Sequence, residues 1–186
     1  FSSEYFSNKE KNIQFYNKLF FDSDVYLGKI LQHYQNLNLD EDTLLVVISD
    51  HGISTGEKFG ERGYGVFCYD YTLLSGAMFC HKNIKPIQIK NQVRSIDILP
   101  TILELLSINQ DPAYENIQGK SLVPLMNGKI ESRIAFSQSG NPLSSSKPPK
   151  EPNVSAVRTD EWKFILNHYD DTEELYNLKT DPKENN

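Results

Sequence analysis

Hydrophobic residues recur at steps of three and four positions after residue 22, which predicts an amphipathic helix of about 14 residues. The apolar positions of this stretch are Val25, Tyr26, Ile30, Leu31, Tyr34 and Leu37. Asp22 or Ser23 can cap its amino end. Residues 1–20 carry aromatic side chains without a clear period, which indicates irregular structure or a short helix.

The pattern changes at residues 43–48, which form an unbroken β-branched and apolar run. A strand that is apolar on both faces belongs inside a parallel sheet covered by helices. Residues 73–79 predict a second strand, and residues 93–106 predict a second helix. Pro100 lies within that helix, where it either kinks the helix or belongs to a first turn that begins near Ile98.

Short alternating stretches near the end of the chain predict a small antiparallel sheet. We expect its strands at residues 133–137, 154–159, 162–166 and 174–178. Residues 138–153 are rich in Ser, Pro and Gly and predict a loop. The whole pattern predicts an α/β fold with a main domain over residues 1–128 and a small antiparallel subdomain over residues 129–186.

Composition narrows the classes of partner. The 186 residues carry a formal net charge of −6, which disfavours a non-specific nucleic-acid or anionic-membrane binder. An anionic substrate would then need a local positive centre, such as a metal ion. Cys68 and Cys80 lie in apolar or aromatic stretches, so we expect buried free thiols. The longest apolar run, residues 44–48, is far shorter than the ~20 residues of a membrane span.

The triplet Asp50-His51-Gly52 directly follows the apolar run at residues 43–48. At the end of a strand the backbone leaves the pleat, so neighbouring side chains can turn toward one ion, and Gly52 permits that change of direction. Divalent cations accept carboxylate oxygen together with imidazole nitrogen. The alternative is an aspartate that caps a loop beside a hydrogen-bonded histidine. The carboxyl end of a buried strand is where open α/β sheets bind ligands.

Ser49-Asp50-His51-Gly52, with Gly56-Glu57 downstream, resembles the "SDHG...GE" segment of the sulfatases, within the alkaline phosphatase superfamily. Four further segments are similar to sulfatase segments in the same order along the chain. They are VRSIDILPTIL at 93–103, QGKSLVPL at 118–125, VRTDEWKFI at 157–165 and the stretch from Glu174 to Glu184. The resemblance therefore extends over most of the sequence.

The resemblance implies the carboxyl-terminal portion of a metal-dependent sulfuric ester hydrolase. Its fold would be an alkaline-phosphatase-like sheet covered by helices, with the small antiparallel subdomain at the end. Asp50 and His51 would bind one divalent metal ion, calcium, with magnesium, manganese or zinc as alternatives. The substrate would be a small-molecule or glycan sulfate ester.

The catalytic nucleophile of sulfatases, a Cys or Ser that is converted to formylglycine, stands in a motif that neither Cys68 nor Cys80 matches. We therefore expect this nucleophile, and the remaining metal ligands, in a missing amino-terminal part of the same protein. The first residue, Phe1, suits either a processed amino terminus or a piece of a longer protein. The isolated chain is expected to be inactive.

The sequence departs from the family in the loop after His51. Many sulfatases carry a sulfate-binding lysine there, where this chain has Gly63-Tyr64-Gly65. Lys58 and Arg62 are nearby cations that could replace it, or they are solvated loop charges. Glu57 either orients His51 or lies on the loop surface.

Two other functions therefore stay open. One is a phosphodiesterase, phosphonate hydrolase or phosphoryl transferase of the same superfamily, and the other is a non-catalytic module that kept the fold.

Overall fold

The computed structural model describes residues 8–61, 63–109, 117–140 and 152–185. The chain forms two compact units. The first unit contains Phe1–Lys85 and Ser139–Asn153, and the second contains Pro86–Gln138 and Val154–Asn186. The predicted domains, residues 1–128 and 129–186, stay a prediction, because compact units within a chain need not coincide with domains.

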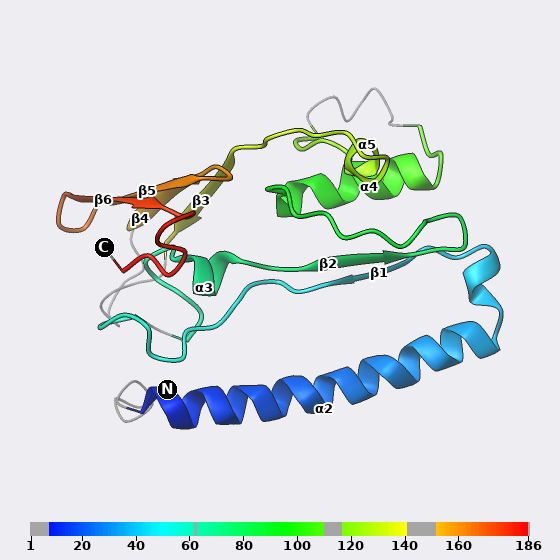
Figure 1. The fold of residues 1–186 in the computed structure, drawn as a ribbon, viewed down its shortest axis with the longest axis horizontal. Helices are drawn as coiled ribbons and strands as arrows, with labels where there is room; N and C mark the ends of the chain where they lie inside the picture. The colour runs from blue at the N-terminus through cyan, green and yellow to red at the C-terminus, as the bar shows by residue number, and fades with distance from the viewer. Residues whose placement is uncertain (1–7, 62, 110–116, 141–151, 186) are drawn as a thin grey trace. The chain divides into compact units, whose positions relative to one another are not determined.

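The first unit contains one long helix, α2, which spans the 28 residues Lys9–Asn36 (Figure 1). Asn8 caps it, with Asn8 Oδ1 accepting a hydrogen bond from the backbone N–H of Lys11 at 3.1 Å. The helix thus begins well before the predicted start near Asp22. The inward positions of its first half include the polar residue Asn12, so the apolar period is hidden there. No described helix is both long enough and apolar enough to cross a membrane.

Hydrogen bonds from near both ends of α2 attach it to the rest of the first unit. Near its start, the Asn12 amide donates to the carbonyl of Thr55 at 3.1 Å. Near its end, the Tyr34 hydroxyl donates to the carbonyl of Thr43 at 2.6 Å. Most other large apolar side chains of the helix are exposed, namely Ile13, Phe15, Leu19, Phe20, Phe21, Val25, Tyr26 and Ile30.

The strands β1 (Leu45–Ile48) and β2 (Ala77–Cys80) form a two-stranded ribbon beside α2 (Figure 1). They pair antiparallel, with Leu45 opposite Cys80 and Ile48 opposite Ala77. Among the described residues β1 therefore has an antiparallel neighbour and not the parallel one that its apolar run predicts. An apolar run carries no information on strand direction. Within the described chain β1 is only half-buried, and Ile48 is exposed. The 3-10 turn η1 (Leu39–Glu41) precedes β1, and the short helix α3 (Asp70–Leu73) precedes β2.

The second unit holds the small sheet. Its elements are η2 (Ser95–Asp97), α4 (Ile98–Leu105), α5 (Val123–Met126), β3 (Ala135–Ser139), β4 (Val154–Arg158), β5 (Trp162–Asn167) and β6 (Thr172–Asn177). The strand order is β3-β4-β5-β6, and β5 is antiparallel to both β4 and β6. This confirms the predicted sheet. Pro100 lies in the first turn of α4, as one of the two alternatives expected, and most of the predicted loop at 138–153 lies outside the described residues.

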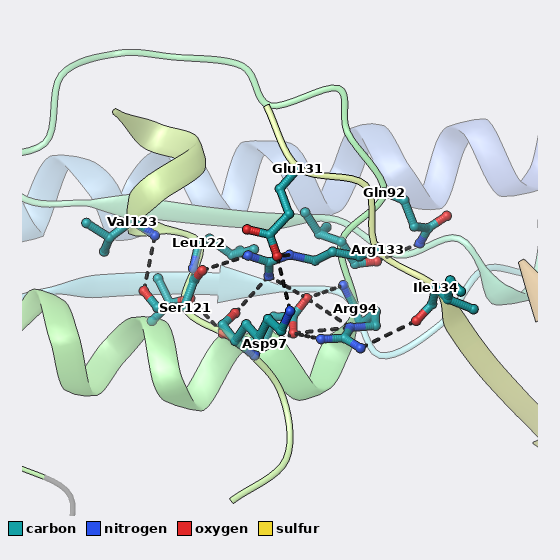
Figure 2. Close-up of polar contacts among 12 residues, drawn as sticks. Gln92, Arg94, Asp97, Ser121, Leu122, Val123, Glu131, Arg133 and Ile134 are labelled. Atoms are coloured by element: carbon teal, nitrogen blue, oxygen red, sulfur yellow. Dashed lines mark hydrogen bonds and ion pairs between the residues drawn. The ribbon is translucent and has the colours of Figure 1, made fainter. Parts of the chain in front are cut away.

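A network of buried charges surrounds Asp97 in the second unit (Figure 2). The Asp97 carboxylate accepts hydrogen bonds from Arg94 Nη2 at 2.8 Å and from the backbone N–H of Lys120 at 2.9 Å, and Arg133 Nη1 pairs with it at 2.9 Å. Burial by itself would raise the pKa of Asp97, but these hydrogen bonds and charges lower the pKa overall. The carboxylate therefore stays ionised and ties η2 to the segments on either side of α5.

A second buried ion pair lies under the small sheet. Lys163 Nζ of β5 is 2.6 Å from Glu184 Oε1, and both side chains are excluded from solvent. The same sheet also buries the apolar residues Val154, Ile165 and Tyr176. The pair thus fastens the end of the chain to the sheet.

Candidate functional site

The predicted metal ligands stand directly after β1. Ser49 closes the ribbon, because its backbone N–H donates to the carbonyl of Gly76 at 3.0 Å and its Oγ accepts from the N–H of Gly76 at 2.8 Å. From Asp50 to α3 the described residues form neither helix nor strand. Asp50 and His51 therefore begin a long loop at the end of a strand, as the sequence predicts.

The side chains of Asp50 and His51 turn toward each other. Asp50 Oδ1 accepts a hydrogen bond from the backbone N–H of His51 at 2.8 Å, and Asp50 Oδ2 lies 3.5 Å from His51 Nε2. On the other side of the ring, His51 Nδ1 is 2.6 Å from the carbonyl oxygen of Gly52. Because a carbonyl oxygen can only accept, Nδ1 must carry a proton.

In the tautomer that carries its proton on Nδ1 alone, His51 presents the lone pair of Nε2 toward the Asp50 carboxylate. Two lone pairs that face each other repel unless a cation lies between them, and ligands of one divalent ion stand about 3 Å apart or slightly more. A backbone carbonyl that accepts the other ring N–H is the usual support of a metal-binding histidine. The side chains are 84% exposed for Asp50 and 39% exposed for His51, so an ion can reach them. The pair fits the metal-ligand role predicted for it.

The loop is held in place by the backbone around α3. The N–H of Gly52 donates to the carbonyl of Thr72 at 2.9 Å, and a Cβ on Gly52 would lie 2.3 Å from the carbonyl oxygen of Tyr71. Gly52 does not have a positive φ. Glycine is therefore required at position 52 because there is no room for a side chain, and not because of the conformational freedom that the sequence suggests.

Tyr64 lies beside His51, and sequence reasoning missed this contact. The ring centres are 5.5 Å apart and the planes meet at 77°, an edge-to-face arrangement. The Tyr64 side chain is 63% exposed. A tyrosine between two glycines gives no signal of such a neighbour, because the contact depends on how the loop folds back.

Glu57 stabilises the loop. Its carboxylate accepts hydrogen bonds from the backbone N–H of Thr55 at 2.7 Å and from Ser54 Oγ at 3.2 Å. Burial alone would raise the pKa of Glu57, but the hydrogen bonds from Thr55 lower the pKa overall. None of its hydrogen bonds within the described chain reaches His51. Of the two roles expected for Glu57, the geometry supports the loop role.

Of the two predicted substrate-binding cations, Lys58 is among the described residues and Arg62 is not. Lys58 Nζ lies 4.8 Å from the ring centre of Tyr69, a cation–π contact. Its role in binding sulfate stays a prediction. Arg62 lies outside the described residues, and its role stays a prediction as well.

Asp50 and His51 form only part of a metal site. The described stretches contain no group of three or more His, Cys, Asp or Glu side chains that could hold an ion. Calcium takes six to eight oxygen ligands, so these two residues would need further ligands. Cys68 is buried and Cys80 is half-buried, and both are free thiols as predicted.

Two protein-family models together match residues 2–186. The family model "N-sulphoglucosamine sulphohydrolase, C-terminal" matches residues 67–186, and the family model "Sulfatase" matches residues 2–108.

Curated relatives agree with the family models. Human arylsulfatase K is 30% identical over 189 residues, which cover 96% of this chain and 34% of the human protein. A sulfatase of Formosa agariphila is 30% identical over 164 residues, covering 87% of this chain and 29% of that protein. A choline-sulfatase of Rhizobium meliloti is 25% identical, covering 96% of this chain and 34% of that protein. The chain spans about a third of the length of these relatives.

Solved structures show the same fold. One is described in complex with its substrate D-glucosamine-2-N,6-O-disulfate, and it has a TM-score of 0.61 at 22% identity. The superposition covers 87% of this chain and 33% of that structure. The phosphonate monoester hydrolase of Silicibacter pomeroyi has a TM-score of 0.66 at 21% identity. The superposition covers 84% of this chain and 32% of that structure. These similarities confirm the predicted α/β fold of the alkaline-phosphatase type.

Proposed function

Because the chain belongs to the sulfatase family, as its carboxyl-terminal portion, we propose that the full-length protein hydrolyses a sulfuric ester at a site to which Asp50 and His51 contribute. One observation carries the proposal. Asp50 Oδ2 and His51 Nε2 converge at 3.5 Å on an exposed point after β1, with the proton of the imidazole kept on Nδ1. This is a donor set for a divalent cation, and sulfatases generally use one.

The residues of this chain would prepare the site in distinct ways. The carbonyl of Gly52 keeps the His51 tautomer that leaves Nε2 as a ligand, and Asp50 supplies a negative oxygen next to it. We favour calcium, with magnesium, manganese or zinc as alternatives. When bound, the ion supplies the positive charge that stabilises sulfate oxyanions and orients a nucleophile. Lys58 and Arg62 are proposed to contribute further positive charge.

We place the nucleophile and the remaining metal ligands in an amino-terminal part of the same protein. The chain spans about a third of the length of its relatives, and the described residues supply only two of the ligands. The apolar side chains of α2 support such a partner, because Phe15, Phe20 and Phe21 are each at least 61% exposed. Eight large apolar side chains are exposed along this one helix, and such a density of exposed apolar side chains favours burial against another segment of chain.

The proposed substrate is a small-molecule or glycan sulfate ester. Support comes from the similar solved structure whose substrate is D-glucosamine-2-N,6-O-disulfate.

The test compares the full-length protein with its Asp50→Asn variant on an aryl sulfate and a sulfated glucosamine, with added calcium, manganese or zinc. Loss of a metal ligand should lower kcat/KM by about a thousandfold, since an ion contributes several kcal/mol to charge stabilisation. Asp24→Asn, at an exposed position of α2, is the matched control and should keep full activity. The isolated 186 residues should show no turnover. Hydrolysis that survives in Asp50→Asn would contradict the proposal.

A phosphonate or phosphate ester hydrolase is the second candidate. Two observations favour it, namely the similarity to the phosphonate monoester hydrolase fold and the stretch Gly63-Tyr64-Gly65 in the region where many sulfatases carry a lysine. Sulfate and phosphonate monoesters of the same phenol, measured side by side, separate the two activities. Metal binding without hydrolysis of either ester would instead support a non-catalytic module.

A further inference from the structure

We propose that Tyr64 is a positioning residue for His51, whose ring keeps the imidazole turned so that Nε2 stays beside the Asp50 carboxylate. The inference rests on the proposed function, in which His51 is a metal ligand. It concerns a residue for which the sequence alone suggests no role.

His51 is restrained from two directions. The hydrogen bond from Nδ1 to the carbonyl of Gly52 fixes one edge of the imidazole at 2.6 Å. One hydrogen bond leaves the ring free to tilt about that edge. The ring of Tyr64, 5.5 Å away at 77°, lies within the range of a favourable edge-to-face pair and restricts this tilt.

The backbone of Tyr64 is itself held on both sides. The carbonyl of Gly63 accepts a hydrogen bond from the N–H of Ser54 at 2.9 Å. Gly65 has a φ of +84°, and a Cβ there would lie 2.8 Å from Thr72 Cβ. Both glycines therefore have defined positions, and the residue between them is directed by its neighbours.

Thr72 of α3 connects the two sides of the site. Its side chain packs against Gly65, next to Tyr64, and its carbonyl accepts the hydrogen bond from Gly52, next to His51. Thr72 is buried, and its hydroxyl donates to the carbonyl of Tyr69 at 3.0 Å. The two loop segments thus share one anchor, so the contact between His51 and Tyr64 is built into the fold of the loop.

The exposure of Tyr64 separates this role from a structural one. With 63% of the side chain in solvent, Tyr64 buries little area, so its removal should cost the fold little. It should instead affect His51. We expect Tyr64→Ala to weaken metal binding about two- to tenfold, the range of an aromatic pair. Tyr64→Phe keeps the ring and should bind the ion as the wild type does.

The experiment titrates calcium and manganese into the full-length protein by calorimetry and follows the His51 ring nitrogens by ¹⁵N NMR without metal. Phe59→Ala is the matched control, because Phe59 is a fully exposed aromatic residue of the same loop. In Tyr64→Ala we expect weaker binding, an averaged His51 signal and an unchanged unfolding temperature. If that variant unfolds early, Tyr64→Leu, which keeps an apolar side chain without a ring, takes its place with the same expected results.

Wild-type affinity in Tyr64→Ala, or equal losses in Tyr64→Phe and Tyr64→Ala, would overturn the inference. His51→Ala separates this failure from that of the proposed function. If His51→Ala loses metal binding while Tyr64→Ala does not, the site stands and only the positioning role is wrong. If His51→Ala binds the ion unchanged, the proposed site is wrong, and the inference is wrong with it.

Discussion

Two aspartates of the chain, Asp50 and Asp97, lie in segments that resemble sulfatase motifs, and their surroundings are opposite. The Asp50 side chain is 84% exposed, and its Oδ2 lies 3.5 Å from His51 Nε2. Asp97 is fully buried, and its two oxygens are occupied by the guanidinium groups of Arg94 and Arg133 and by two backbone N–H groups (Figure 2). The first aspartate has coordination capacity left for a ligand, and the second has none.

The comparison shows how a motif residue can be assigned a role from its hydrogen bonds. A carboxylate that accepts from several fixed donors stabilises the fold and stays ionised, whereas one that lies open next to a second ligand can bind an ion. The contrast belongs to the two aspartates and not to the two units as wholes. The first unit also has a buried carboxylate with internal partners, because Glu61 accepts from the backbone N–H of Val66 at 2.6 Å and from the Tyr71 hydroxyl at 3.2 Å.

Breaking the buried ion pair of Lys163 and Glu184 in the second unit is expected to have the largest effect on stability. Lys163→Met removes the buried ammonium group that pairs with the Glu184 carboxylate, which should lower the free energy of unfolding by about 3–5 kcal/mol. Urea unfolding of the full-length protein measures it. The exposed pair of Lys179 and Glu161, at 2.9 Å, is the control. Lys179→Met should cost less than about 1 kcal/mol, and equal losses in the two variants would contradict the prediction.

Asp97→Asn should cost about 3 kcal/mol, because the buried Arg133 loses the nearer of its two carboxylate partners and keeps only Glu131, whose Oε1 lies 3.7 Å from Arg133 Nε. The loss of stability caused by this substitution should depend on pH. The pKa of Asp97 is lower in the folded state than the ordinary 3.8, so the unfolded chain binds this proton more readily. The carboxylate therefore contributes stability above pH 3.8, and that contribution is lost as the pH falls through the folded-state pKa.

Thermal unfolding of the wild type and of Asp97→Asn between pH 3 and pH 7 tests this dependence. The difference between the two proteins should shrink on acidification. A difference that stays constant over this range would show that the charge of Asp97 is not the cause.

Gly52→Ala probes the open site with a smaller change. The new Cβ would clash with the carbonyl of Tyr71, so the loop must shift, which should cost about 1–3 kcal/mol and weaken metal binding about tenfold. Gly28 of α2 is the matched control, because a methyl group added there would have no other atom within 4 Å. Gly28→Ala should stabilise the protein by about 0.5–1 kcal/mol. Calorimetry with calcium and urea unfolding measure both variants.

Local patterns predicted much of the second unit. The strands β4, β5 and β6 follow short alternating stretches, and the turn chemistry of Pro100 indicates where α4 begins. The early half of α2 could not be predicted, because Asn12 is the buried residue there and the exposed positions are aromatic. The direction of the strand that pairs with β1 could not be predicted either. A fully apolar strand is compatible with a parallel neighbour and with an antiparallel one.

The site shows the same limit. Asp50 and His51 could be identified because they are adjacent in the sequence and follow a strand. Tyr64 could not, because its contact with His51 depends on the packing of Gly52 and Gly65 against Thr72. Such contacts are set by the tertiary fold and leave no periodic trace.

The hydrogen bond from Asn12 to Thr55 has a practical consequence for protein engineering. Thr55 lies in the loop that carries the site, and its buried carbonyl receives this amide from the first turns of a helix more than forty positions earlier. A truncation designed to begin just ahead of the first recognisable motif would keep Asp50 and His51 while removing the donor that braces their loop. Deletion boundaries for this protein are therefore better chosen from its long helix than from its signature sequence.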